Sequence, residues 1–294
     1  MNMNCPLCNA SESRPSWLDR VFFEGVEFRY RECLSCRSLY CDPMPDEATL
    51  SRMYGPQYSA GFANGHATVR DPKEPLRVVD WLRTTATGTF VDYGCGDGAL
   101  LSKAAALNWK AIGVEFDDQV SAATARRTGA QVITVSQLES LPPQCVDVLH
   151  LGDVIEHLTE LGRQMPSILK LIRPGGLLLA QGPLEANANL FTFAVRLGRR
   201  LRRARRTEMA PYHVLLATAS GQRRFFKHFG LQEVEYAVRE VAWPAPARLS
   251  WSDCVKTRPA GLFLLRRLSQ SISALRPARW GNRYFYAGRR SNDA

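Results

Sequence analysis

Residues 89–101 of this chain read Thr89-Phe90-Val91-Asp92-Tyr93-Gly94-Cys95-Gly96-Asp97-Gly98-Ala99-Leu100-Leu101. The pattern predicts a short apolar strand that ends at an acid, Asp92, and runs through three alternating glycines into a helix. Glycine has no Cβ and tolerates positive φ, so this backbone can turn sharply and approach a ligand closely. The first N–H groups of the helix have no partner within it and can bind a carboxylate or a phosphate.

Glu115 ends the next apolar run, which spans residues 110–115. A carboxylate at the end of a second strand can accept hydrogen bonds from both hydroxyls of a ribose. The glycine loop alone is a weak signal, because Gly94, Gly96 and Ala99 also satisfy a loose dinucleotide-binding pattern. Together, the loop and Glu115 predict a binding site for a nucleoside-containing cofactor.

The chain resembles class I S-adenosylmethionine-dependent methyltransferases in three segments. In that family an acid stands two residues before Gly-x-Gly-x-Gly, as Asp92 does here. Residues 146–158 (VDVLHLGDVIEHL) are similar to the family's fourth strand and the turn over the methionine end of the cofactor. Residues 171–180 (LIRPGGLLLA) are similar to its tight turn into strand five. The three segments keep the family's order.

The resemblance implies an α/β fold with a Rossmann-like sheet, mostly parallel, whose last strand is antiparallel and inserts between its neighbours. Alternating strand and helix patterns agree with such a sheet covered by helices. A helix is expected at about 218–229. The expected strands are 89–94, 110–115, 131–135, 146–151, 177–182, 232–238 and 283–287.

The resemblance also implies S-adenosylmethionine as the cofactor. One position departs from the family, because many relatives carry an aspartate after the third strand that contacts the adenine amino group. Gln137 stands there instead, and glutamine can still hydrogen-bond adenine. The expected cofactor-binding residues are Asp92, Gly94, Gly96, Gly98, Glu115, Gln137 and Asp153.

Two Cys-x-x-Cys pairs, Cys5 with Cys8 and Cys33 with Cys36, are separated by 24 residues. Four thiolates make a closed tetrahedral Zn²⁺ site, which is structural because no coordination position stays open. Residues 26–31 alternate like a strand of a small hairpin, so a zinc ribbon is expected. A ribbon this small has little core, so the metal would supply most of its folding energy. A redox dithiol or unrelated cysteines are the alternatives.

Length and composition limit the domain organisation and the cellular location that can be expected of this chain. With 294 residues, 45% of them hydrophobic and 22% charged, the chain suits one large domain with additions. No apolar run approaches the roughly 18 residues of a membrane span, and the N-terminus has no apolar signal region, so we expect a cytoplasmic protein. The expected parts are a zinc ribbon (1–45), a helical connector (46–85) and a methyltransferase domain (86–294) with basic insertions near 187–212 and 240–280.

The net charge of +10 is unevenly distributed. Residues 1–186 carry 17 Lys and Arg against 22 Asp and Glu, whereas residues 187–294 carry 21 against 6. This asymmetry indicates an anionic partner for the last third. Apolar residues interleave with arginines at 196–206 and precede Arg266 and Arg267, which suits a cationic amphipathic helix on an anionic membrane. A solvated helix and a nucleic-acid contact are the alternatives.

Candidate catalytic residues follow strand four. Methyl transfer from a sulfonium is an in-line displacement, so the enzyme must align the nucleophile and, where necessary, remove a proton. His157 is a candidate base because histidine titrates near neutrality, and Glu156 could orient it or bind a sugar hydroxyl. His213 is a second candidate, since relatives often place a substrate-facing histidine before the next helix. The alternative is that these side chains cap or pack local structure.

The leading interpretation is methyl transfer, O-directed in preference, to a small-molecule or glycan acceptor, including a lipid-linked one. A zinc ribbon before a methyltransferase core resembles a bacterial group associated with sugar and polysaccharide modification. An RNA methyltransferase using the basic last third is the alternative, although residues 152–155 lack the Asn/Asp-Pro-Pro-aromatic turn of amino-methylating base enzymes. A non-enzymatic binding module on a decayed scaffold is disfavoured by the intact glycine loop and Glu115.

Overall fold

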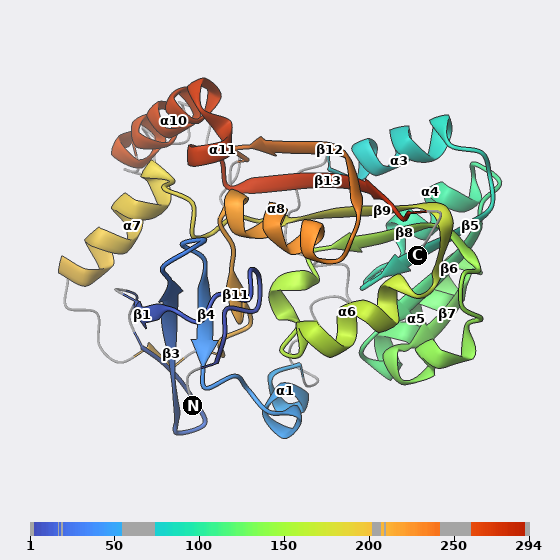
Figure 1. The fold of residues 1–294 in the computed structure, drawn as a ribbon, viewed down its shortest axis with the longest axis horizontal. Helices are drawn as coiled ribbons and strands as arrows, with labels where there is room; N and C mark the ends of the chain where they lie inside the picture. The colour runs from blue at the N-terminus through green and yellow to red at the C-terminus, as the bar shows by residue number, and fades with distance from the viewer. Residues whose placement is uncertain are drawn as a thin grey trace. The chain divides into compact units, whose positions relative to one another are not determined.

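A computed structural model describes residues 3–16, 18, 20–54, 74–201, 207–208, 210–241 and 260–291 (Figure 1). The chain forms two compact units, each built from several segments. The unit that we call the ribbon unit consists of Met1–Met44, Pro183–Phe225 and Tyr236–Tyr284. The unit that we call the core unit consists of Pro45–Gly182, Phe226–Glu235 and Phe285–Ala294.

A seven-stranded sheet has the order β12-β13-β9-β8-β5-β6-β7, so the glycine-loop strand, β5, is an interior strand between β8 and β6. Parallel pairing joins β5 to β6 and β8, β6 to β7, and β8 to β9. This arrangement confirms the predicted Rossmann-like, mostly parallel sheet. The strands are β5 (Thr89–Tyr93), β6 (Lys110–Glu115), β7 (Gln131–Thr134), β8 (Val146–Gly152), β9 (Ile172–Pro183), β12 (Gln232–Arg239) and β13 (Arg283–Arg289).

The last strand, β13, lies between β9 and β12 and runs antiparallel to β9. Backbone hydrogen bonds join Gly175 and Gly176, near the start of β9, to Arg290, just after β13. At the other end, the Leu184 N–H donates to the Asn282 carbonyl, at 2.7 Å. The prediction of an inserted antiparallel last strand is therefore confirmed.

The central strands are apolar runs because both faces of the sheet are covered. Val91, Leu149 and Leu178 are fully buried, as expected for parallel strands packed on both sides. β9 begins at Ile172, five residues before the predicted strand, because the turn with Gly175 and Gly176 is incorporated through a register irregularity between β8 and β9. The helices nearby are α3 (Glu74–Thr84), α4 (Ala99–Ala105), α5 (Asp118–Thr128), α6 (Leu161–Leu169) and α8 (Ala219–His228).

A second sheet belongs to the ribbon unit and has the order β10-β2-β3-β4-β11, with β1 also paired to β3. The hairpin of β2 and β3 confirms the strand expected at residues 26–31. Two strands from far along the chain extend this small sheet, since β10 pairs with β2 and β11 pairs with β4. The strands are β1 (Ser13–Pro15), β2 (Val21–Phe23), β3 (Val26–Cys33), β4 (Leu39–Asp42), β10 (Thr207–Glu208) and β11 (Leu215–Leu216).

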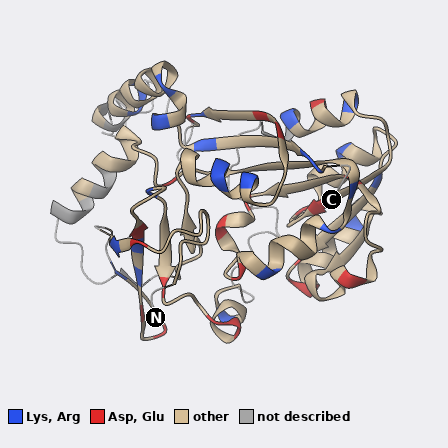
Figure 2. Ribbon diagram, in the orientation of Figure 1, with Lys and Arg blue, Asp and Glu red and all other residues tan. Residues whose placement is uncertain are grey.

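The ribbon unit also contains helices α7 (Leu190–Leu201), α10 (Ala260–Leu275) and α11 (Pro277–Trp280). The basic excess of residues 187–294 is visible on α8 and α10 in Figure 2. Residues 202–206 of the arginine cluster lie outside the described residues, as does 242–259 of the second insertion. Among the helices that the structure describes, none is long and apolar enough to cross a membrane.

The connector expected at 46–85 contains two helices, α1 (Glu47–Met53) and α3, while residues 55–73 lie outside the described part of the chain. Asp46 caps α1, because its Oδ1 accepts a hydrogen bond from the Thr49 N–H at 2.8 Å. An N-cap aspartate satisfies one of the N–H groups that a helix start leaves unpaired. Tyr54 is the C-terminal cap residue of α1.

Candidate active site

The loop after β5 requires glycine on geometric grounds. Gly94, Gly96 and Gly98 have φ values of 79°, 52° and 71°, which side-chain-bearing residues rarely adopt. A Cβ at Gly94 would lie 2.7 Å from Cγ2 of Val154, and one at Gly98 would lie 2.6 Å from Cγ2 of Thr128. At Gly94 and Gly98 the loop therefore packs against the turn after β8 and against α5, with no room for a side chain.

Glu115, at the end of β6, is tied directly to this loop. Its Oε2 accepts a hydrogen bond from the Gly96 N–H at 2.9 Å, and its Oε1 accepts one from the Phe116 N–H at 2.8 Å. Burial raises the pKa of Glu115 above its ordinary value, while these N–H donors oppose that shift by stabilising the carboxylate. The carboxylate is thus held in place before any ligand arrives.

A cavity of about 210 Å³ opens beside the loop within the core unit. Gly94, Gly96, Glu115 and Asp153, all expected to bind the cofactor, line it together with His157. Asp153 has a positive φ of 55°, and its N–H donates to the Gln181 carbonyl at 3.0 Å. Non-glycine residues held in this conformation cluster at functional sites. The structure therefore brings most of the expected cofactor residues to one cavity.

Asp92 is not among the lining residues. It is 5% exposed, and its Oδ1 lies 2.7 Å from Nδ1 of His150 on the neighbouring strand. The two residues are opposite each other in the register of β5 and β8. A histidine partner satisfies a carboxylate that would be costly to bury alone. Sequence reasoning did not select His150, because its pairing with Asp92 depends on strand order.

Gln137 uses its side chain locally. Its Oε1 accepts from the Thr134 N–H at 3.0 Å, in a capping box at the start of the 3₁₀ helix Val135–Ser140. Gln137 is exposed and does not line the cavity, whereas Val135 does. The adenine contact expected of Gln137 stays a prediction.

His157 lines the cavity and has an aromatic partner. It ends the 3₁₀ helix Ile155–His157, and its Nδ1 lies 2.8 Å from the hydroxyl of Tyr54. The Tyr54 ring meets the imidazole edge-on and also packs against the Phe116 ring, with centroids 5.8 Å apart. Tyr54 lies 103 residues before His157, so no local pattern could have indicated the pair.

Glu156 and His213 are the other two candidate catalytic residues. Glu156 is 6% exposed and is not a lining residue of this cavity. His213 belongs to the ribbon unit, where its Nδ1 lies 2.7 Å from Oε2 of Glu185, just after β9. The Tyr30 hydroxyl donates to the His213 carbonyl at 2.8 Å. Sequence reasoning missed Glu185, since an isolated glutamate after a strand carries no distinguishing signal.

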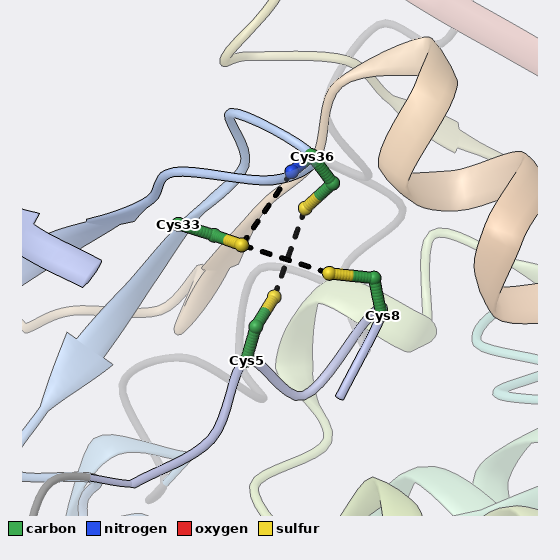
Figure 3. Close-up of side chains that lie close together, drawn as sticks. All are labelled: Cys5, Cys8, Cys33 and Cys36. Carbon is green, nitrogen blue, oxygen red and sulfur yellow. Dashed lines mark hydrogen bonds between the residues drawn. The ribbon is translucent and has the colours of Figure 1, made fainter. Parts of the chain in front are cut away.

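The four cysteines of the two Cys-x-x-Cys pairs converge in the ribbon unit (Figure 3). Their sulfur atoms all lie within 4.8 Å of one another, with Cys5 and Cys36 at 3.7 Å and Cys8 and Cys33 at 3.6 Å. Sulfur atoms at the corners of a tetrahedral zinc site stand about 3.8 Å apart, from a Zn–S distance of about 2.3 Å. The contact between the two sulfur atoms lowers the pKa of Cys36, which favours its thiolate, and raises the pKa of Cys5.

The segment that contains the second cysteine pair, Cys33 and Cys36, is hydrogen-bonded to the start of α8. The Thr218 hydroxyl donates to the Cys36 carbonyl at 2.6 Å, and the Thr218 N–H donates to the Ser38 hydroxyl at 3.0 Å. Arg224 donates to the Ser35 hydroxyl at 2.8 Å. A Cβ at Gly221 would stand 2.2 Å from the Ser38 oxygen, so this contact requires glycine.

The glycine loop after β5, the Glu115 carboxylate at the end of β6 and the strand order of the sheet define an α/β protein of the S-adenosylmethionine-dependent methyltransferase class. The family described as "Methyltransferase domain" matches residues 68–236, more than half of the chain. The chain belongs to that family.

Curated relatives and solved structures agree with this class. Ribosomal protein L11 methyltransferase from Sodalis glossinidius (strain morsitans) is 32% identical over 179 residues, covering 58% of this chain and 56% of the relative. The chain thus spans little more than half the length of the curated relatives that it matches.

Two solved structures share the fold. The 1,6-didemethyltoxoflavin-N1-methyltransferase of Burkholderia thailandensis is 12% identical, with a TM-score of 0.52 over 95% of this chain and 99% of the other. The Haemonchus contortus Phospholethanolamine N-methyltransferase 2 is 13% identical, with a TM-score of 0.51 over 93% of this chain and 71% of the other. Both structures contain S-adenosylhomocysteine.

Proposed function

We propose that the protein methylates an oxygen of a small-molecule or glycan acceptor, with S-adenosylmethionine as the methyl donor. The observation that carries the proposal is the Glu115 carboxylate, fastened to the glycine loop in a cavity that also contains His157. A prearranged carboxylate can accept both ribose hydroxyls without reorganising. When bound, the cofactor supplies the electrophilic methyl group, and the remaining work belongs to the chain's own residues.

His157 is the proposed base of the core unit. In the tautomer with hydrogen on Nδ1, the imidazole donates to the Tyr54 oxygen, and Nε2 carries the lone pair that accepts the acceptor's proton. Tyr54 would then act as a positioning residue that selects this tautomer. A sugar hydroxyl is a poor nucleophile at neutral pH, so a positioned base would raise its rate by about 10²–10⁴.

His213 is the second proposed base, and Glu185 supports that role. A carboxylate at 2.7 Å from Nδ1 fixes the ring and stabilises the imidazolium that forms on proton uptake. Glu156, buried after β8, is the next candidate if neither histidine accepts the proton.

Cys5, Cys8, Cys33 and Cys36 are the proposed ligands of one structural Zn²⁺. Four sulfurs at tetrahedral separations fit this ion, and its binding would stabilise a ribbon with little apolar core. The ribbon strands also hold the His213 segment, since the Cys41 N–H donates to the Val214 carbonyl at 2.8 Å and β4 pairs with β11. Loss of the metal would therefore disturb the surroundings of His213.

The match to ribosomal protein L11 methyltransferases favours a second candidate acceptor, a ribosomal protein. RNA remains the alternative that the basic last third of the chain supports.

The test is to incubate the full chain with methyl-labelled S-adenosylmethionine and separated fractions of glycans, small molecules, ribosomal proteins and RNA. Label is expected in a glycan or small-molecule fraction, in a form that resists mild base, as a methyl ether does. Glu115→Ala is the control that should transfer little label. Label confined to ribosomal protein or RNA would overturn the proposed acceptor class.

A further inference from the structure

Helix α10 buries two serines and leaves three leucines exposed, which is unusual for a surface helix. Ser269 and Ser273 are 1% and 2% exposed, whereas Leu264, Leu268 and Leu275 are 56%, 54% and 82% exposed. Both serine hydroxyls donate to Oε2 of Glu240, and Ser269 does so at 3.1 Å. The buried serines are therefore satisfied, and this orientation of the helix is the one that its hydrogen bonds require.

The three exposed leucines form one stripe. Positions 264, 268 and 275 are four and seven residues apart, which places them on the same side of an α-helix. A surface helix normally turns such a stripe toward the core. An apolar stripe left on the outside, while serines occupy the inside, indicates a surface that contacts something other than water.

Helix α7 adds a second exposed apolar pair in the same unit. Phe193 and Leu197, four residues apart, are 53% and 42% exposed. The two helices are adjacent: the Phe191 N–H donates to the Ser269 hydroxyl at 3.3 Å, and the Arg266 guanidinium lies 4.1 Å from the centre of the Phe191 ring. Of the ten large apolar side chains exposed in the described part of the chain, five belong to α7 and α10.

The charge of these two helices has a single sign. The sequence of α7 includes Arg196, Arg199 and Arg200, that of α10 includes Arg266 and Arg267, and neither includes an Asp or Glu. Basic residues of α10 are visible in Figure 2. Helices that lie in a membrane interface typically combine leucine and phenylalanine with basic residues such as arginine. In such helices the arginines contact lipid phosphates and the apolar side chains enter the acyl boundary.

We infer that the exposed face of α7 and α10 is a docking surface for an anionic lipid bilayer. The apolar stripe distinguishes this partner from RNA, whose phosphates would use the arginines and leave the leucines in water. The single-sign charge distinguishes it from an ordinary protein interface, whose core is depleted of charged side chains. The inference does not depend on the proposed methyl transfer, because bilayer binding needs neither cofactor nor acceptor.

The test is flotation of the full chain with vesicles of phosphatidylcholine alone or mixed with phosphatidylglycerol. Wild type should bind the anionic vesicles more tightly, and added salt should weaken binding. Leu264→Gln/Leu268→Gln should lose about tenfold in affinity for each leucine. Arg267→Gln should lose about fivefold at low salt.

The matched control is Leu76→Gln/Val234→Gln, which replaces two equally exposed apolar residues of the core unit. It should bind vesicles like wild type, and the thermal transition of each variant reports that the fold is intact. Equal vesicle binding by wild type and Leu264→Gln/Leu268→Gln would overturn the inference. So would a lipid-free dimer, seen by ultracentrifugation, that the same double variant dissociates, since the stripe would then join two copies.

Discussion

Replacing Glu115 with alanine should weaken S-adenosylmethionine binding while the fold persists. The carboxylate is held by the N–H groups of Gly96 and Phe116 on the wall of the cavity. Loss of a hydrogen bond to a charged group costs about 1.5–3 kcal/mol, which corresponds to a roughly 10- to 150-fold rise in Kd. Isothermal titration calorimetry measures this directly, with Glu139→Gln, an exposed acid of the same unit, as the control.

The pH dependence of binding provides a second readout. Burial raises the pKa of Glu115 from its ordinary value of 4.5. The ionised carboxylate is the stronger ribose acceptor, so affinity should be full above the raised pKa and fall as the pH drops through it. Glu115→Gln should bind weakly with no such decline. Wild-type affinity in Glu115→Ala, or parallel pH profiles for wild type and Glu115→Gln, would refute the assignment of Glu115.

The same shift has a consequence for stability, with the opposite sign. A carboxyl whose pKa is higher in the folded state binds its proton more tightly there, so its ionised form lowers the free energy of unfolding. The cofactor-free protein should therefore gain stability as the pH falls through the raised pKa toward 4.5. Urea unfolding checks this, and Glu115→Gln should lack the gain.

Three further predictions follow from the site. Gly96→Val should abolish calorimetric cofactor binding, because a branched side chain cannot take the φ of 52° at the loop; binding like wild type would contradict the loop's role. Purified protein should contain one zinc per chain by elemental analysis, and Cys33→Ser should lose it and increase amide exchange in the ribbon while the core sheet stays protected; a metal-free protein with a protected ribbon would contradict the zinc site. His157→Ala or His213→Ala, whichever removes the base, should lower turnover by about 10²–10⁴ with cofactor affinity retained, and Tyr54→Phe should change the pH–rate profile if His157 is that base. Near-normal turnover in both histidine variants would transfer the role to Glu156 or Asp153.

Much of the fold could be predicted from the sequence because its determinants are local. Parallel strands covered on both faces require continuous apolar runs, so β5, β6, β7 and β8 were located to within about two residues. The glycine loop needed positive φ at three positions, and only glycine takes it readily. Metal-ligand spacing is equally local, and the four cysteines converge as the two Cys-x-x-Cys pairs indicated.

The tertiary structure alone decided which side chains meet across long separations. The Tyr54–His157 and Ser38–Thr218 pairs depend on contacts between segments 103 and 180 residues apart. Strand order placed Asp92 opposite His150, and Asp92 does not line the cavity.

The orientation of α10 was decided in the same way. Its sequence is compatible with an inward-facing leucine stripe, but Ser269 and Ser273 face inward, where their hydroxyls donate to the partly buried carboxylate of Glu240. Periodicity records which residues share a face of a helix. Which face turns inward depends on what the rest of the chain places beside it.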